Sequence, residues 1–380
     1  MMEMGCDIFC RVVDNYGDIG VCWRLARQLA AEHGYRPRLW IDQPAALARL
    51  CPGVDPMLAR QTNGGVEVRR WDQPFPEVAA AEVVIEAFGC QIPETYLAAM
   101  VARAEAGAPP AWINLEYLSA EDWVASHHGL PSPHPRLPLV KHFFIPGFGS
   151  SSGGLLREAG LLRQRRDWRT DWAELGLQAP AADEISVSLF CYENPALPEL
   201  LQTWSEGKQR IRCLLAPGPA QEQAAAWLGL SSFEPGRSQR RGQLGLFALP
   251  FYAQEVYDHL LWSCDLNFVR GEDSFVRAQW AERPLLWQAY PQQEAAHLAK
   301  LAAFLERYCA GLPEVAAAGY RAFARTWNGD RGASAPLAES WQALLAWRPA
   351  LDLHARRWAE QLGASEDLAT RLVKFVKGLV

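Results

Sequence analysis

Two carboxylates follow an apolar segment near the N-terminus, and they are the residues best placed to do chemistry. Residues 7–13 read Asp-Ile-Phe-Cys-Arg-Val-Val, and residues 14–20 continue as Asp-Asn-Tyr-Gly-Asp-Ile-Gly. This pattern predicts a strand followed at once by a helix, and ligands of open α/β sheets bind beyond the carboxyl ends of such strands. The glycines lack the spacing of a dinucleotide fingerprint, and two acids disfavour a pyrophosphate. We therefore expect Asp14 and Asp18 to face a cation, or a group that must lose a proton.

A second turn, at residues 271–274, reads Gly-Glu-Asp-Ser and follows the apolar segment 266–270. A helix is predicted to begin at 273, with Asp273 or Ser274 as its N-cap. The backbone amides at such a helix start attract anions, and the helix dipole adds to this attraction. The turn therefore suits a phosphate group of a nucleotide-type ligand.

Aromatic and amide side chains stand at the ends of two more predicted strands in the same half of the chain. Phe190 and Tyr192 end the segment 184–191, whereas Phe251 and Gln254 follow the segment 244–250. Aromatic faces stack on a nucleobase, and an amide can read its edge.

Each of these patterns also has a purely structural interpretation. Asp14 and Asp18 can cap a turn and a helix, because aspartate is a preferred N-cap. The turn 272–274 can be a cap, and a single aromatic residue is more often part of a core. The residue types leave both interpretations open.

The elements that must position these residues alternate regularly between strand and helix. Such alternation predicts parallel sheets and two Rossmann-like, doubly wound halves, with a helical region from about 293 interrupted at Pro336 and near Gly363. The predicted strands are 7–13, 38–42, 66–71, 83–88, 111–117, 141–146, 184–191, 211–216, 244–250, 266–270 and 284–290, and the main predicted helices are 18–33, 94–106, 197–206, 220–229, 253–264 and 273–282.

The stretch 149–183 is rich in glycine, serine, arginine and proline and is typical of a crossing between domains. We expect a first lobe at 1–180, a second lobe at 181–340 and a helical tail at 341–380. One arrangement of the tail is a return to the first lobe.

Composition limits the classes of function. The chain has 380 residues, 49% of them hydrophobic, and a net charge of -6, which argues against a general nucleic-acid binder. Nine scattered cysteines without a Cys-x-x-Cys pair indicate buried reduced thiols and a cytoplasmic protein. Neither a signal peptide nor an apolar run long enough to span a membrane is recognisable.

Several motifs of other enzyme classes are missing from the sequence. There is no Gly-x-Ser-x-Gly, no Walker loop and no Asp-x-Asp, and the eight histidines lack the spacing of metal ligands. A serine hydrolase, a P-loop ATPase and a metal site are therefore disfavoured.

The order of motifs along the chain resembles the bacterial elongation factor P maturation arginine rhamnosyltransferases. The resemblance covers almost the full length and is weakest after about residue 330. It rests on Val-Asp-Asn-Tyr-Gly-Asp-Ile-Gly at 13–20, Asn-Leu-Glu-Tyr-Leu-Ser-Ala-Glu at 114–121, His-Gly-Leu-Pro-Ser-Pro at 128–133, Phe-Phe-Ile-Pro-Gly-Phe at 143–148, Gly-Gly-Leu-Leu-Arg-Glu at 153–158, Phe-Cys-Tyr at 190–192, Leu-Pro-Phe-Tyr-Ala-Gln at 249–254 and Val-Arg-Gly-Glu-Asp-Ser-Phe at 269–275.

This resemblance implies a GT-B glycosyltransferase whose two lobes face a central cleft. Such an enzyme moves L-rhamnose from dTDP-β-L-rhamnose to an arginine of elongation factor P, inverts the anomeric centre and needs no metal or other cofactor. No nucleic acid or membrane is implied as a partner.

The resemblance also implies roles for the residues. Asp18 is the general base, and Asp14 and Glu272 complete the expected catalytic set, with Glu272 also bonded to a ribose hydroxyl. Phe190 and Phe251 pack around the thymine and Gln254 reads its edge. The full set expected at the donor is Tyr16, Gly17, Phe190, Tyr192, Phe251, Gln254, Arg270, Gly271, Glu272, Asp273 and Ser274.

The residue chemistry fits this reaction. A guanidinium is a poor nucleophile because its charge is delocalised and its pKa exceeds about 12. A carboxylate such as Asp18 can orient the planar N–H groups and take a proton as the new bond forms. The amides at 273–275 can receive the charge of the leaving diphosphate.

Two other classes remain open on the sequence. One is a GT-B enzyme with the same type of donor and a small-molecule or lipid acceptor. The lack of an amphipathic basic surface helix disfavours it, whereas basic residues in the tail keep it open: Arg356, Arg357, Arg371, Lys374 and Lys377. The other is a nucleotide-dependent binding or oxidoreductase module, which the missing dinucleotide glycines disfavour.

Overall fold

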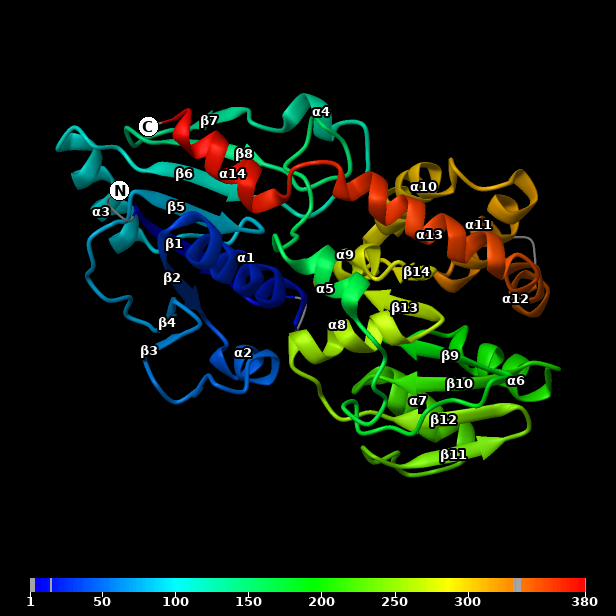
Figure 1. Ribbon diagram of the computed structural model, residues 1–380. Coiled ribbons are helices and arrows are strands. Elements are labelled where there is room, and N and C mark those ends of the chain that lie inside the picture. The colour runs from blue at the N-terminus through cyan, green and yellow to red at the C-terminus, as the bar shows by residue number, and fades with distance from the viewer. Residues whose placement is uncertain (1–3, 14–15, 331, 333–335, 380) are drawn as a thin grey trace. The chain divides into compact units, whose positions relative to one another are not determined.

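The computed structural model describes residues 4–13, 16–330, 332 and 336–379 (Figure 1). The chain divides into two compact units: unit 1 comprises Met1–Leu161 and Gly363–Val380, and unit 2 comprises Leu162–Leu362. The unit boundaries lie at Leu161 and Leu362, whereas the sequence pattern predicts divisions after residues 180 and 340. No described helix is long and apolar enough to cross a membrane.

Unit 1 is built on one mixed sheet with the strand order β3-β4-β2-β1-β5-β6-β8-β7. The interior strands are parallel, whereas β3 and β7 pair antiparallel at the two edges. Because β1 lies between β2 and β5, the strand order reverses beside β1. The strands are β1 (Met4–Cys10), β2 (Tyr35–Ile41), β3 (Arg60–Asn63), β4 (Val66–Arg70), β5 (Val83–Ala87), β6 (Ala111–Leu115), β7 (Pro131–Pro133) and β8 (Val140–Phe144).

The helices of unit 1 include the C-terminal helix of the chain. α14 packs against α1, and Gln28 of α1 donates to the Asp367 carboxylate at 3.0 Å, where Asp367 caps α14. The last turns of the chain are thus part of unit 1. The helices are α1 (Gly17–His33), α2 (Pro44–Leu50), α3 (Glu94–Glu105), α4 (Val124–His127) and α14 (Leu368–Lys377).

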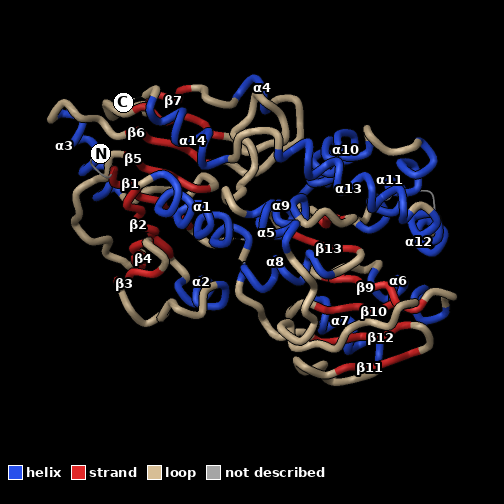
Figure 2. The backbone as a smooth tube through the Cα atoms, viewed as in Figure 1, coloured by secondary structure: helices blue, strands red, loops and turns tan. Residues whose placement is uncertain are grey.

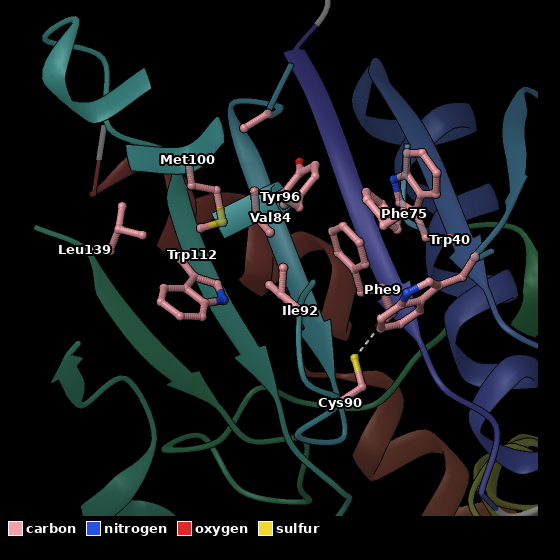
Figure 3. Close-up of a cluster of buried hydrophobic side chains, with 12 residues drawn as sticks. Phe9, Trp40, Phe75, Val84, Cys90, Ile92, Tyr96, Met100, Trp112 and Leu139 are labelled. Atoms are coloured by element: carbon pink, nitrogen blue, oxygen red, sulfur yellow. Dashed lines mark hydrogen bonds between the residues drawn. The ribbon is translucent and has the colours of Figure 1, made fainter. Parts of the chain in front are cut away.

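The core of unit 1 holds β1 in place through an aromatic cluster (Figure 3). Phe9 stacks on Trp40 with ring centroids 6.0 Å apart and meets Tyr96 edge-on at 4.7 Å. In the middle of the strand the buried Asp7 accepts hydrogen bonds from Arg38, Trp40 and Tyr96. These contacts fix the direction in which the chain runs at the carboxyl end of β1.

Unit 2 repeats the doubly wound plan with the strand order β11-β12-β10-β9-β13-β14, and only β11 is antiparallel among its described strands. Figure 2 shows its strands side by side in one layer. The strand order reverses between β9 and β13. The strands are β9 (Glu184–Leu189), β10 (Arg210–Leu215), β11 (Ser238–Arg241), β12 (Leu244–Ala248), β13 (Leu266–Arg270) and β14 (Leu285–Gln288).

The helices of unit 2 confirm the predicted alternation and the helical region that follows it. α12 begins directly after Pro336 and α13 ends at Gly363, which are the two predicted interruptions. The helices of unit 2 are α5 (Leu161–Asp167), α6 (Leu197–Glu206), α7 (Pro219–Leu228), α8 (Gln254–Ser263), α9 (Asp273–Trp280), the short 3₁₀ helix η1 (Gln293–Ala295), α10 (Ala296–Cys309), α11 (Glu314–Trp327), α12 (Leu337–Ala346) and α13 (Arg348–Gly363).

The nine cysteines are free thiols, and eight of them are buried, as predicted.

Candidate active site

The predicted donor residues of unit 2 gather where its strand order reverses. Phe190 follows β9 directly, and its backbone N–H donates to the carbonyl of Phe268 in β13 at 3.0 Å. Gly271 and Glu272 follow β13. In doubly wound sheets the carboxyl ends of the two strands at such a reversal form the usual ligand site. The structure thus brings the segment after β9 and the predicted turn 271–274 together within unit 2.

The Arg270 side chain lies between two aromatic rings at this edge. Its guanidinium carbon is 4.4 Å from the ring centroid of Phe190 and 4.4 Å from that of Tyr192. Arg270 is buried, so the cation–π contacts are made largely out of water and are stronger for it. The ring faces that meet Arg270 are covered, and a base can stack only on other surfaces of these two rings. Arg270 gives the edge a fixed positive charge.

The turn 271–274 adopts a conformation that directs a helix start to the same edge. Gly271 has a φ of 61°, which favours glycine. Helix α9 begins at Asp273 with Glu272 as its N-cap, and no side chain caps it. The prediction that Asp273 or Ser274 is the N-cap is therefore wrong. The Ser274 hydroxyl instead donates to the carbonyl of Arg270, because it lies one helical turn beyond that group.

Asp273 is engaged by a neighbouring helix. The Gln254 side-chain amide donates to the Asp273 carboxylate at 2.8 Å, and Gln254 is the first residue of α8. One turn further along both helices, Arg277 donates to Asp258 at 3.0 and 2.7 Å. These paired contacts fix the starts of α8 and α9 relative to each other. Because an ionised carboxylate only accepts hydrogen bonds, Gln254 turns its amide nitrogen toward Asp273.

Two further predicted residues lie at these helix starts. Phe251 is half-buried just before α8, and Glu272 is half-buried just before α9.

Two tyrosines at this edge of the unit 2 sheet are not among the predicted site residues. Tyr257, which follows Gln254 by nearly one helical turn, meets the Phe190 ring edge-on with centroids 6.0 Å apart. Burial, and next the charge of Asp273, raise the pKa of its hydroxyl, which has no hydrogen-bond partner among the described residues. Tyr290 meets the Tyr192 ring at 5.2 Å and is 49% exposed. Two signals point to them: the helical spacing of Tyr257 from Gln254, and the position of Tyr290 as the last residue of the predicted strand 284–290.

In unit 1 the Asp18 carboxylate lies at the carboxyl end of β1. Asp18 is the second residue of α1, is only 2% exposed and accepts a hydrogen bond from the backbone N–H of Val13 at 2.8 Å. Tyr16 is the N-cap of α1 and Gly17 its first residue, so both of these predicted donor residues belong to unit 1. Asp14 lies outside the described residues.

Asp18 therefore has a structural task as well as a position suited to chemistry. Its bond to Val13 holds the chain that leaves β1, and the neighbouring Asp42 accepts from the N–H of Val12 at 3.0 Å in the same manner. Asp18 also lies close enough to Cys10 to help raise the pKa of that thiol, after the larger effects of Cys22 and burial. Within the described residues, no group of three or more histidine, cysteine, aspartate or glutamate side chains could hold a metal ion.

Comparison with known proteins decides the family. The family described as "Elongation-Factor P (EF-P) rhamnosyltransferase EarP" matches residues 6–377. The chain belongs to this family. The enzyme is 52% identical over 376 residues to the protein-arginine rhamnosyltransferase of Pseudomonas aeruginosa, a match covering 97% of this chain and 98% of the relative. It is 34% identical over 382 residues to that of Neisseria meningitidis, covering 98% and 96% of the two chains. The enzyme is a glycosyltransferase.

Solved structures confirm the predicted GT-B fold class. The structure described as "Structural basis for EarP-mediated arginine glycosylation of translation elongation factor EF-P" has a TM-score of 0.70 and 34% identity, with both chains covered completely. The spinosyn rhamnosyltransferase SpnG has a TM-score of 0.53 at 12% identity, covering 99% of this chain and 100% of that one. At that identity the likeness shows the fold alone.

Proposed function

We propose that the enzyme transfers L-rhamnose from dTDP-β-L-rhamnose to an arginine side chain of translation elongation factor P, with inversion at the anomeric carbon. The observation that carries this proposal is the family match over residues 6–377, together with relatives named protein-arginine rhamnosyltransferase that align over nearly their full length. A cytoplasmic site of action fits the eight buried free thiols and a protein acceptor that serves translation.

The edge of unit 2 is suited to the donor. In this proposal Phe251 and the accessible surfaces of Phe190 and Tyr192 pack around thymine, and Gln254 contacts the base from the start of α8. Arg270 and the start of α9 face the diphosphate, so that a guanidinium and the positive end of a helix dipole meet the same anion. Glu272 bonds a ribose hydroxyl, because a carboxylate beside phosphate would be repelled.

Asp18 serves the acceptor. Its carboxylate accepts hydrogen bonds from the guanidinium, which orients one nitrogen toward the anomeric carbon of the sugar. As the new C–N bond forms, the bond between that carbon and the diphosphate oxygen breaks. The attacking nitrogen loses a proton to Asp18, and dTDP leaves with the bonding electron pair. Asp14 is proposed to hold the guanidinium or to position Asp18.

We propose that the leaving group departs without a metal. Charge accumulates on the diphosphate as the sugar acquires oxocarbenium character, and fixed donors stabilise such charge without reorganising. The side chain of Arg270 and the backbone amides at the start of α9 are the donors that we assign to this task.

Intact-mass analysis of elongation factor P tests the proposal. After incubation with the enzyme and dTDP-β-L-rhamnose, we expect a mass gain of one deoxyhexose, and no gain when the acceptor arginine is replaced by lysine. NMR of the product checks inversion through the anomeric configuration of the attached sugar. An unchanged mass, or a gain that persists on the lysine variant, contradicts the proposed acceptor. Transfer to a small alcohol or lipid in its place would favour the alternative acceptor class.

A further inference from the structure

A strained aromatic residue stands at the carboxyl edge of the sheet in unit 1. Phe88 has a φ of 57°, and it is the one aromatic residue among the four described non-glycine residues with positive φ. A side chain in this region is strained and persists where the surroundings impose it, often at functional sites. Phe88 follows the last residue of β5, which is the neighbour of β1 across the reversal of strand order.

The surroundings of Phe88 do impose this conformation. Its N–H donates to the Leu115 carbonyl of β6 at 2.7 Å. Two residues further on, the Cys90 thiol donates to the Phe9 carbonyl of β1 at 3.2 Å, as Figure 3 shows. The turn is therefore tied to the carboxyl ends of both neighbouring strands, and Phe88 cannot relax without breaking these contacts.

The ring of Phe88 lies against a second ring from the next strand end. Phe88 and Tyr117 stack with centroids 4.5 Å apart and ring planes 20° apart, and both side chains are half-buried. Tyr117 follows β6, and the preceding residue, Glu116, places a half-buried carboxylate at the same strand end. A pair of stacked aromatic rings thus stands at the same edge of the sheet as the carboxyl end of β1.

This combination suits a planar cation. Aromatic faces attract cations, and a guanidinium stacks on them more readily than an ammonium does because it is flat and weakly hydrated. The Asp18 carboxylate, at the end of the adjacent strand β1, can accept hydrogen bonds from N–H groups, whereas the rings offer a surface for the guanidinium plane. Resting on the function proposed above, we infer that Phe88 and Tyr117 form the subsite that receives the guanidinium of the acceptor arginine. The backbone strain at Phe88 sets the direction of this surface.

A double-mutant cycle tests the inference by equilibrium binding of elongation factor P to the full-length enzyme. With the natural acceptor, Phe88→Leu is expected to weaken binding about 2- to 30-fold, the range of a cation–π contact. With an acceptor whose target arginine is replaced by alanine, the same substitution should cause no further loss. Phe88→Tyr, which keeps an aromatic face, should restore most of the affinity.

A control measurement and the binding data together distinguish failure of this inference from failure of the proposed function. The dissociation constant of dTDP, measured on the same variants, should stay unchanged, which shows that the binding edge of unit 2 remains folded. An equal loss with both acceptors, or no loss with either, overturns the assignment of Phe88 while leaving the proposed function standing. A wild-type enzyme that neither binds nor modifies elongation factor P overturns the proposed function and this inference together.

Discussion

The Asp258 carboxylate accepts two hydrogen bonds from the Arg277 guanidinium, and this buried pair joins helix α8 to helix α9. The contact lies one helical turn behind the hydrogen bond between Gln254 and Asp273. In the proposed donor site the start of α8 contacts the base, and the start of α9, with Arg270, faces the diphosphate. The geometry of this site therefore depends on an ion pair that itself has no role in the chemistry.

Breaking this pair should destabilise unit 2. The side chains of Arg277 and Asp258 are 3% and 5% exposed, so Arg277→Met leaves a charge buried without its partner, at a cost of about 3–5 kcal/mol. Chemical denaturation followed by tryptophan fluorescence measures the loss. The double variant Asp258→Leu with Arg277→Met should recover part of it, because both charges are then gone. A single variant as stable as the wild type would show that the pair does not hold the helices.

Phe251→Ala should weaken donor binding by about 1–3 kcal/mol, on the scale of base–aromatic stacking. Calorimetric titration with dTDP measures the effect. Tyr252→Phe is a matched control at the next position, because the Tyr252 hydroxyl donates to the Leu175 carbonyl and the ring packs in the core around Leu175. Equal affinities of wild type and Phe251→Ala would remove Phe251 from the site.

A chelator should leave the transfer rate unchanged. The proposed mechanism assigns the diphosphate charge to Arg270 and to the start of α9, so no step waits for a divalent ion. The measurement is the initial rate of sugar transfer with and without EDTA. Strong inhibition that added magnesium or manganese reverses would refute the metal-free mechanism.

The free energy of unfolding should fall as the pH is lowered, because the histidines beside α14 have lowered pKa values in the folded protein. Burial, and next the Arg371 cation, lower the pKa of His128 below its ordinary value of 6.5, and its Nδ1 accepts a hydrogen bond from the N–H of Ile145. As the pH falls through about 6.5, the unfolded chain takes up a proton that folded His128 takes up only at lower pH. The folded state is therefore favoured less as acid is added.

The replacement His128→Asn isolates this effect. Asparagine keeps an acceptor near the position of Nδ1 but does not titrate. The melting temperature of the variant protein should therefore depend less steeply on pH below 6.5 than that of the wild type. Burial also lowers the pKa of His142 and His354, so some dependence should persist in the variant. Identical slopes for the two proteins would exclude His128 as a source of the dependence.

The interior of the fold can be predicted from the sequence, and its edges cannot. Parallel strands such as β5 and β13 are buried on both faces and read as mainly apolar runs, Val-Val-Ile-Glu-Ala and Leu-Asn-Phe-Val-Arg. The antiparallel strands β3, β7 and β11 escape prediction because they are short and polar, with Ser-Gln-Arg-Arg forming the whole of β11. Such strands form because the sheet edge offers backbone partners, which local sequence does not encode.

The candidate site can likewise be predicted only in part from the sequence. Phe190, Tyr192 and Arg270 are visible in the sequence as strand-end residues, and the structure brings them together. The contact of Gln254 with Asp273 joins two helices, and the sequence shows only that each residue begins a helix. The backbone conformation of Phe88 cannot be predicted, because nothing in the residue type indicates a left-handed φ. The neighbouring strands impose this conformation.

The single-turnover rate of Asp18→Asn, with donor and elongation factor P both saturating, tests the central claim most directly. Asparagine can still accept the N–H of Val13 but cannot take the proton, so we predict a loss of about 10²–10⁴-fold with donor affinity unchanged. Asp42→Asn is the matched control, because Asp42 makes the same kind of contact with Val12 and should keep the wild-type rate. Transfer by Asp18→Asn within a few-fold of the wild-type rate would contradict the assignment of Asp18 as the base.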